Sequence, residues 1–157
     1  LFSDNDERAI FFAKGVIETV KKLNWAPDII HVHGWLASLL PLYLREYYKD
    51  EPLFNESKIV TSVYNQSFNN TLNKDMVNKI KFDNINEEAI KPLEEPTYNN
   101  LMQVAVDYSD ALIIGSEVLP ENLETYIKDS NKPVLEYKSK DEFGEAYTQF
   151  FNTEVLS

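Results

Sequence analysis

The two histidines of the chain stand two residues apart, at the end of a short run of β-branched residues. His31 and His33 flank Val32, so on a β-strand both imidazoles would project from the same side of the sheet. Such imidazoles can make an ordinary hydrogen bond at a strand end or ligate a metal ion. No third metal ligand stands near them in sequence, and we expect no metal site.

Polar residues also close two further runs that are typical of buried strands. Tyr64 and Asn65 stand at the end of the run 58–64, and Ser116 follows the run 111–114 after a glycine. Parallel sheets bind ligands outside the carboxyl ends of their strands, so these side chains are candidate ligand contacts. Turn chemistry at the strand ends is the alternative explanation for all of them.

Helical and strand-like segments alternate along the chain, and they predict the scaffold that carries these residues. Apolar residues recur at helical spacing in 4–23, 35–48, 101–108, 120–128 and 143–151. Strand-like runs occupy 28–33, 58–64, 111–114 and 132–136. The alternation predicts an α/β, Rossmann-like domain with a mostly parallel sheet and helices on both faces.

Three local patterns predict how individual helices begin. Asp4 with Glu7, and Ser139 with Glu142, have the spacing of a capping box, in which a side-chain oxygen accepts a hydrogen bond from a backbone N–H group. Pro41 must either kink the second helix or lie near its first turn, because proline cannot donate a backbone hydrogen bond.

Two segments are open to more than one interpretation. The stretch 65–95 is rich in Asn, Lys and Glu, which predicts an excursion carrying one short helix. We expect its part 69–95 to be a solvated flap, with a partner-docking loop as the alternative. The aromatic residues of 35–54 could form a surface for sugar stacking, but their spacing is more typical of a core. These residues are Trp35, Tyr47, Tyr48 and Phe54.

The composition limits the classes of partner. There are 26 acidic and 15 basic residues, and the net charge of -11 would repel nucleic acid and anionic membranes. The chain has no cysteine, which excludes disulfides and thiolate chemistry. No apolar run approaches the ~20 residues of a membrane span, and the first residues lack a signal-peptide pattern, so we expect a cytoplasmic protein.

Four segments resemble motifs of the bacterial glycogen synthases and plant starch synthases. The segment 27–35, PDIIHVHGW, resembles the family stretch P-D-[IV]-[IV]-H-x-H-D-W. The segment 3–12 is similar to the family's D-N-x-x-R-[FY] motif, and the segment 58–65 to its K-x-V-x-T-[IV]-H-N strand. The segment 108–116 is similar to its A-D-x-[VL]-x-x-V-S stretch. The resemblance covers roughly residues 1–128.

This resemblance implies the GT-B fold, in which two Rossmann-like domains face each other across a cleft. The chain would be the carboxy-terminal part of the amino-terminal, acceptor-side domain. The implied reaction is the retaining transfer of glucose from ADP-glucose or UDP-glucose to an α-1,4-glucan, without a cofactor. By the same resemblance, His33 would contact the donor glucose and Asp4 would be an acceptor-side carboxylate. Weaker candidates for substrate binding are His31, Trp35, Tyr64, Asn65 and Ser116.

The sequence departs from the family pattern at positions beside the candidate site. Gly34 stands where the family has Asp, Leu36 where it has a polar residue, and Tyr64 where it has His. The sequence also has neither the family's linker into the second domain nor its lysine-glycine loop for the diphosphate. We therefore expect a short form with a single domain, residues 1–157, that is incomplete or inactive alone. It would act with a donor-binding domain or a homo-oligomer partner.

Two other functions remain open at the level of sequence. The departures favour a catalytically degenerate module that binds glucan or regulates a partner. An unrelated Rossmann-like protein that binds a nucleotide or anion is disfavoured, because neither G-x-G-x-x-G nor G-x-x-x-x-G-K-[ST] is present among four glycines.

Overall fold

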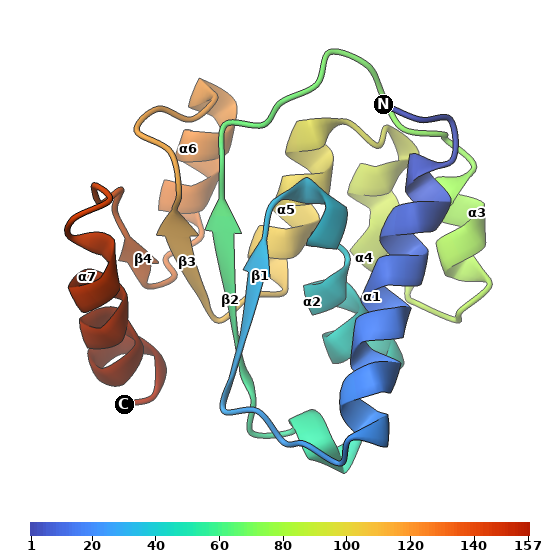
Figure 1. Cartoon of the computed structure of the whole chain (residues 1–157). Helices are drawn as coiled ribbons and strands as arrows, with labels where there is room; N and C mark the ends of the chain where they lie inside the picture. The colour runs from blue at the N-terminus through green and yellow to red at the C-terminus, as the bar shows by residue number, and fades with distance from the viewer.

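A computed structural model describes the whole chain, residues 1–157, and its centre is a four-stranded sheet. The strands are β1 (Ile29–His33), β2 (Lys58–Val63), β3 (Ala111–Ile114) and β4 (Val134–Leu135). They lie in the order β1-β2-β3-β4, and every neighbouring pair is parallel (Figure 1). The α/β, Rossmann-like class predicted from the sequence is confirmed.

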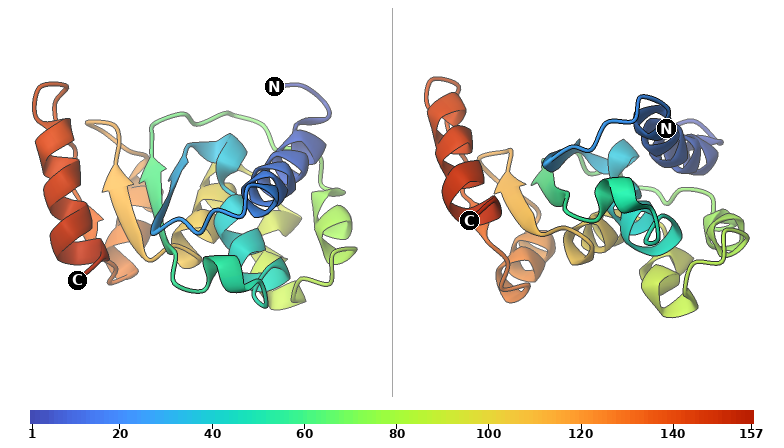
Figure 2. Two further views of the ribbon diagram at one scale, coloured as in Figure 1. Left: turned by 60° about the horizontal axis from the view of Figure 1, so that its bottom comes forward. Right: turned by 90° about the horizontal axis from the view of Figure 1, so that it is seen from below.

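Helices cover both faces of this sheet, as predicted (Figure 2). Right-handed crossovers between successive parallel strands bring the connecting helices to one face. These are α2 (Leu40–Leu42), α5 (Tyr98–Asp107) and α6 (Glu121–Asp129). The opposite face is covered by α7 (Phe143–Phe150), while α1 (Asn5–Lys22) packs beside α2 near β1. No helix has the combined length and apolar character that a membrane span requires.

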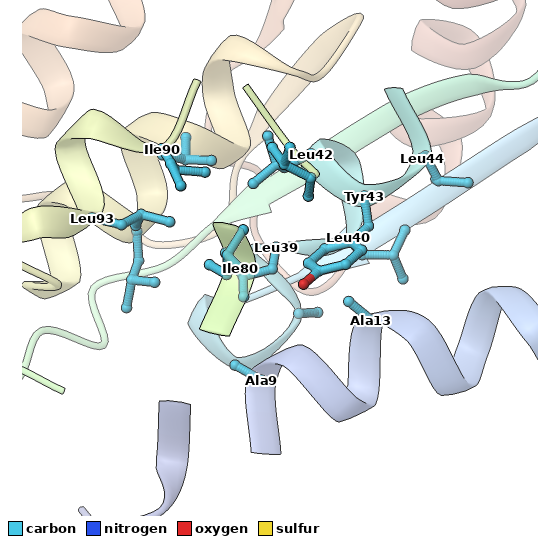
Figure 3. Packing of buried hydrophobic residues seen from close by; sticks show 14 of the residues in the cluster. Ala9, Ala13, Leu39, Leu40, Leu42, Tyr43, Leu44, Ile80, Ile90 and Leu93 are labelled. Carbon is cyan, nitrogen blue, oxygen red and sulfur yellow. The ribbon is translucent and has the colours of Figure 1, made fainter. Parts of the chain in front are cut away.

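The largest core cluster lies between α1, α2 and the segment that follows β2. Ala9 and Ala13 on α1 are fully buried, and their small side chains allow close approach of the neighbouring helix. Figure 3 shows Ala13 beside Leu40 and Tyr43. A second cluster packs α5 and α6 on the sheet, and a third lies beneath α7.

The segment 69–95 is not a solvated flap, and the prediction of a single short helix in 65–95 is wrong. It forms α3 (Met76–Lys81), α4 (Glu87–Ile90) and a 3₁₀ turn, Lys91–Glu94. Apolar residues that are dispersed among its polar ones are buried in the largest core cluster. They are Leu72, Met76, Val77, Ile80, Ile85, Ile90 and Leu93. The polar composition belongs to the outer side of this segment, whereas its inner side completes the core.

The long helix predicted for 35–48 is divided into three pieces. A 3₁₀ turn, Trp35–Ala37, precedes α2, and the π-helical turn Tyr43–Tyr47 follows it. Pro41 lies in the first turn of α2, one of its two expected positions. A proline there needs no intrahelical partner for its nitrogen, but it prevents a continuous helix through 35–48.

Neither predicted capping box forms. The Asp4 side chain caps no backbone N–H group and instead pairs with Arg8, its Oδ1 lying 2.9 Å from Nε. The Ser139 hydroxyl donates to the Glu142 carboxylate at 2.6 Å, and α7 begins only after Glu142. Asp4 thus pairs with Arg8, and Ser139 with Glu142, and neither Asp4 nor Ser139 accepts a side-chain hydrogen bond from a backbone N–H group at the helix start.

Candidate functional site

The two histidines lie together at the carboxyl end of β1, on the face of the sheet that α7 covers. Their ring centroids are 4.0 Å apart. His31 Nε2 lies 2.7 Å from Ser62 Oγ, and His33 Nδ1 lies 2.7 Å from the Tyr64 hydroxyl. The parallel register pairs His33 with Ser62, so each imidazole reaches the β2 chain on the same side of the sheet. The expectation that both histidines project to one side is confirmed.

Both imidazoles are neutral at pH 7. Burial, with a smaller contribution from His33, lowers the pKa of His31 to about 4. Burial also lowers the pKa of His33 below its usual 6.5. No group of three or more His, Cys, Asp or Glu side chains is arranged to hold a metal ion. The pair can therefore donate and accept hydrogen bonds, but it offers a ligand no fixed positive charge.

Tyr64 is held in place from three directions. Its hydroxyl binds His33, and its ring lies nearly parallel to that imidazole, with centroids 6.1 Å apart and an interplanar angle of 26°. The Tyr98 hydroxyl donates to the Tyr64 carbonyl oxygen. Gly115, at the end of β3, leaves room for the ring, because a Cβ there would lie 2.4 Å from Tyr64 Cε1. The phenol is therefore a fixed neighbour of His33.

The loops after the strands complete the rim of the site. The Asn65 backbone N–H donates to Ser116 Oγ at 3.0 Å, which joins the loops after β2 and β3. Gly34 has a φ of 70°, and a Cβ there would lie 2.8 Å from Gln66 Oε1. Glycine at position 34 thus suits both the backbone and the adjacent side chain. Asn65 and Ser116 contribute to loop geometry here.

Two of the sequence candidates do not join the histidine pair. Trp35 is half-buried and packs edge-on against Phe68, with ring centroids 5.4 Å apart, so its ring serves the core. Asp4 is exposed at the start of α1, where the Arg8 guanidinium lowers the pKa of its carboxyl. The alternative sugar-stacking surface of 35–54 is also not formed as a unit, because Tyr48 and Phe54 are buried.

Sequence reasoning missed the contributions of Ser62, Tyr147 and Phe151. Ser62 binds His31, and two aromatic rings approach His31 from α7 and the π-helical turn that follows it. The ring centroids of Tyr147 and Phe151 lie 5.9 Å and 5.6 Å from that of His31. The four-residue spacing of aromatic residues in 143–151 was visible, but nothing in the sequence indicated which face of the sheet the helix would cover.

Comparisons with known proteins agree on one family. The sequence model of one protein family, the starch synthase catalytic domain, matches residues 1–130. The glycogen synthase of Clostridium perfringens is 30% identical over 122 residues, covering 78% of this chain and 25% of the relative. That of Chlorobium luteolum is 36% identical over 115 residues, covering 73% and 23%. That of Thermotoga petrophila is 28% identical over 144 residues, covering 90% and 29%.

The chain thus spans about a quarter of the length of the curated relatives that it matches. No solved structure matches it significantly.

Proposed function

The chain belongs to the family of the starch synthase catalytic domain, and from that premise we propose that it forms part of a glycogen/starch synthase-type glycosyltransferase. In this proposal it is the carboxy-terminal part of the acceptor-side domain of a GT-B enzyme. The reaction is transfer of glucose, with retention, from ADP-glucose or UDP-glucose to the end of an α-1,4-glucan. The cytoplasm is the compartment that we predict for it.

The observation that carries the proposal is the state of His33. Its imidazole is exposed and neutral, and Nδ1 is engaged by the Tyr64 hydroxyl at 2.7 Å. Nε2 has no hydrogen-bond partner within the chain, so it can face a ligand beyond the end of β1. Glucosyl transfer passes through an oxocarbenium-like state, which nearby neutral dipoles can stabilise without binding an anion. A fixed imidazole at the end of β1 suits this task.

The same site supports the proposal that the chain is incomplete as a catalyst. A departing diphosphate needs fixed positive charge, but the groups around His33 are imidazole, phenol, hydroxyl and amide. We therefore propose that the cations come from a donor-binding domain, either on another segment or on a partner. No metal or cofactor is needed in this scheme. Asp4, paired with Arg8, stays a candidate for contact with the glucan.

The proposal is tested on the full-length gene product. Transfer of labelled glucose from ADP-glucose and from UDP-glucose to maltohexaose is measured for the unaltered protein, for His33→Ala and for His33→Gln. We expect the Ala variant to lose most of the transfer rate, and the Gln variant to retain more of it, because an amide can replace one hydrogen bond. Equal rates for all three proteins would refute the role of His33.

A second candidate function is a catalytically degenerate module that binds glucan. The neutral, cation-free surroundings of the histidine pair favour it, because such a site suits an uncharged sugar better than a diphosphate. Calorimetric titrations distinguish the two. Binding of both the nucleotide sugar and maltohexaose supports the transferase, whereas binding of maltohexaose alone supports the module.

A further inference from the structure

The aromatic side chains of the carboxy-terminal helix form one continuous row. Phe143 and Tyr147 on α7, and Phe151 just after it, are spaced four residues apart and so share a helix face. The Phe143 and Tyr147 centroids are 5.5 Å apart, and those of Tyr147 and Phe151 are 6.1 Å apart. Both contacts are close to edge-on, a preferred arrangement of aromatic pairs.

This row continues into the histidine pair. Tyr147 contacts His31, and His31 contacts His33, which in turn lies against Tyr64. Burial and, to a smaller extent, the Tyr64 phenol raise the pKa of Tyr147, while the Ser62 hydroxyl acts in the opposite direction. Rings from β1, the β2 end and α7 thus form a single connected group at one end of the sheet. We call Phe143 and Tyr147 the α7 wall.

Core packing explains only part of the row. Phe151 and Tyr147 are half-buried against the third core cluster, which includes Val60 and Ile113. Phe143, in contrast, is 48% exposed in the first turn of α7. That turn lies at the end of the molecule toward which the strands point (Figure 1). Phe143 contacts Tyr147 but is not among the residues packed against the third core cluster, so core packing does not account for its exposed ring.

We propose that the α7 wall is a sugar-stacking subsite that binds one glucosyl unit of an α-1,4-glucan next to His33. This inference rests on the proposed function, and it adds residues from outside the matched family region 1–130. A glucosyl ring has an apolar C–H face that can lie on an aromatic ring, and hydroxyls at its edge that can bind imidazole and phenol groups. The wall and the histidine pair offer these two kinds of contact side by side.

Charge favours this occupant over an anionic one. The chain carries a net charge of -11, and no Lys or Arg side chain hydrogen-bonds to the histidines or to the wall. A phosphate or a nucleotide would find no cation already bonded to these side chains and would be repelled by the net negative charge, whereas a neutral oligosaccharide would meet no charge penalty. A glucan that extends from His33 toward Phe143 matches the chemistry of these side chains.

The test is a calorimetric titration of the full chain with maltohexaose, comparing the unaltered protein with Phe143→Ala. We expect Kd to rise by about 3–10-fold, the range given by the loss of one aromatic contact. Phe143→Trp should restore tight binding, since it retains an aromatic face. The matched control is Phe82→Ala, because Phe82 is 87% exposed and lies at the end of α3, across the molecule from α7 (Figure 1).

Saturation-transfer NMR supplies a second readout that does not depend on affinity alone. Irradiation of aromatic protons should transfer magnetisation to the C–H protons of maltohexaose in the unaltered protein and in Phe82→Ala, and much less in Phe143→Ala. A rise in Kd of less than threefold for Phe143→Ala, or an equal rise for Phe82→Ala, would overturn the wall while leaving the transferase proposal standing. No binding of maltohexaose by the unaltered chain would instead overturn the proposed acceptor role itself.

Discussion

Gly115→Ala is the sharpest test of how Tyr64 and His33 are held. The added methyl group would lie 2.4 Å from Cε1, 2.6 Å from Cδ1 and 2.9 Å from Cζ of Tyr64. These distances are far inside van der Waals contact, so the phenol ring must move. If the ring moves, its hydroxyl leaves His33 Nδ1, which it now meets at 2.7 Å. The substitution therefore acts on stability and on the site together.

Overpacking of this kind costs about 2 kcal/mol, to which the lost hydrogen bond adds about 1 kcal/mol. For a chain of this length, the melting temperature should fall by ~6–12 °C. Urea and thermal unfolding measure the loss, and an NMR pH titration of the His33 ring protons should show a changed pKa. The double variant Gly115→Ala with Tyr64→Ala should lose less stability than the two single losses predict, because the clash is absent.

Gly15→Ala is the matched control. Gly15 lies within α1, where an added Cβ would meet nothing within 4 Å, so alanine should be neutral or stabilise by up to about 1 kcal/mol. The reasoning about Tyr64 fails if Gly115→Ala unfolds at the same urea concentration as the unaltered protein. It also fails if Gly15→Ala and Gly115→Ala lose stability equally.

Two further predictions concern stability. The pKa of His31 is about 4 in the folded chain, below its ordinary 6.5, so protonation of this imidazole favours the unfolded chain. The contribution of His31 to the free energy of unfolding is therefore lost as the pH falls below 6.5. Between pH 7 and pH 5 the unfolding free energy should fall by about 1 kcal/mol after a discount for partial exposure, and His31→Asn should flatten that slope in urea titrations. Lys79→Ala should lower the free energy of unfolding by about 3 kcal/mol, because it leaves the buried Asp6 carboxylate without its cation. Asp6 is fully buried, its Oδ2 lies 2.6 Å from Lys79 Nζ, and its Oδ1 has no partner. Adding Asp6→Asn should recover most of that loss; if it recovers nothing in urea unfolding, the uncompensated charge is not the cause.

The sheet was predictable from the sequence because each strand is a compact apolar run. The four runs appear in the structure within a few residues of their expected bounds, although β4 is reduced to two residues. The segment 65–95 was misjudged, because single apolar residues such as Leu72 and Leu93 are spread among polar ones and do not follow one helical period. Its folding is decided by the core surface on which it packs.

The candidate site was predictable only in part. Alternation along β1 was enough to place His31 and His33 on one side. Their partners depend on the register between β1 and β2 and on the clearance at Gly115, which no local pattern encodes. Tyr64 is the clearest case, since as a departure from the family pattern it favours a loss of activity at the level of sequence. In the structure it is the residue that fixes the His33 ring.

The order of the strands in space, β1-β2-β3-β4, is also their order along the chain. Each strand therefore docks on the one synthesised just before it, and the sheet can be assembled in the direction in which the chain leaves the ribosome. The imidazoles of β1 gain their partners Ser62 and Tyr64 as soon as β2 is in place. The α7 wall lies later in the chain than β2, so the histidine pair can form before its aromatic neighbours are synthesised.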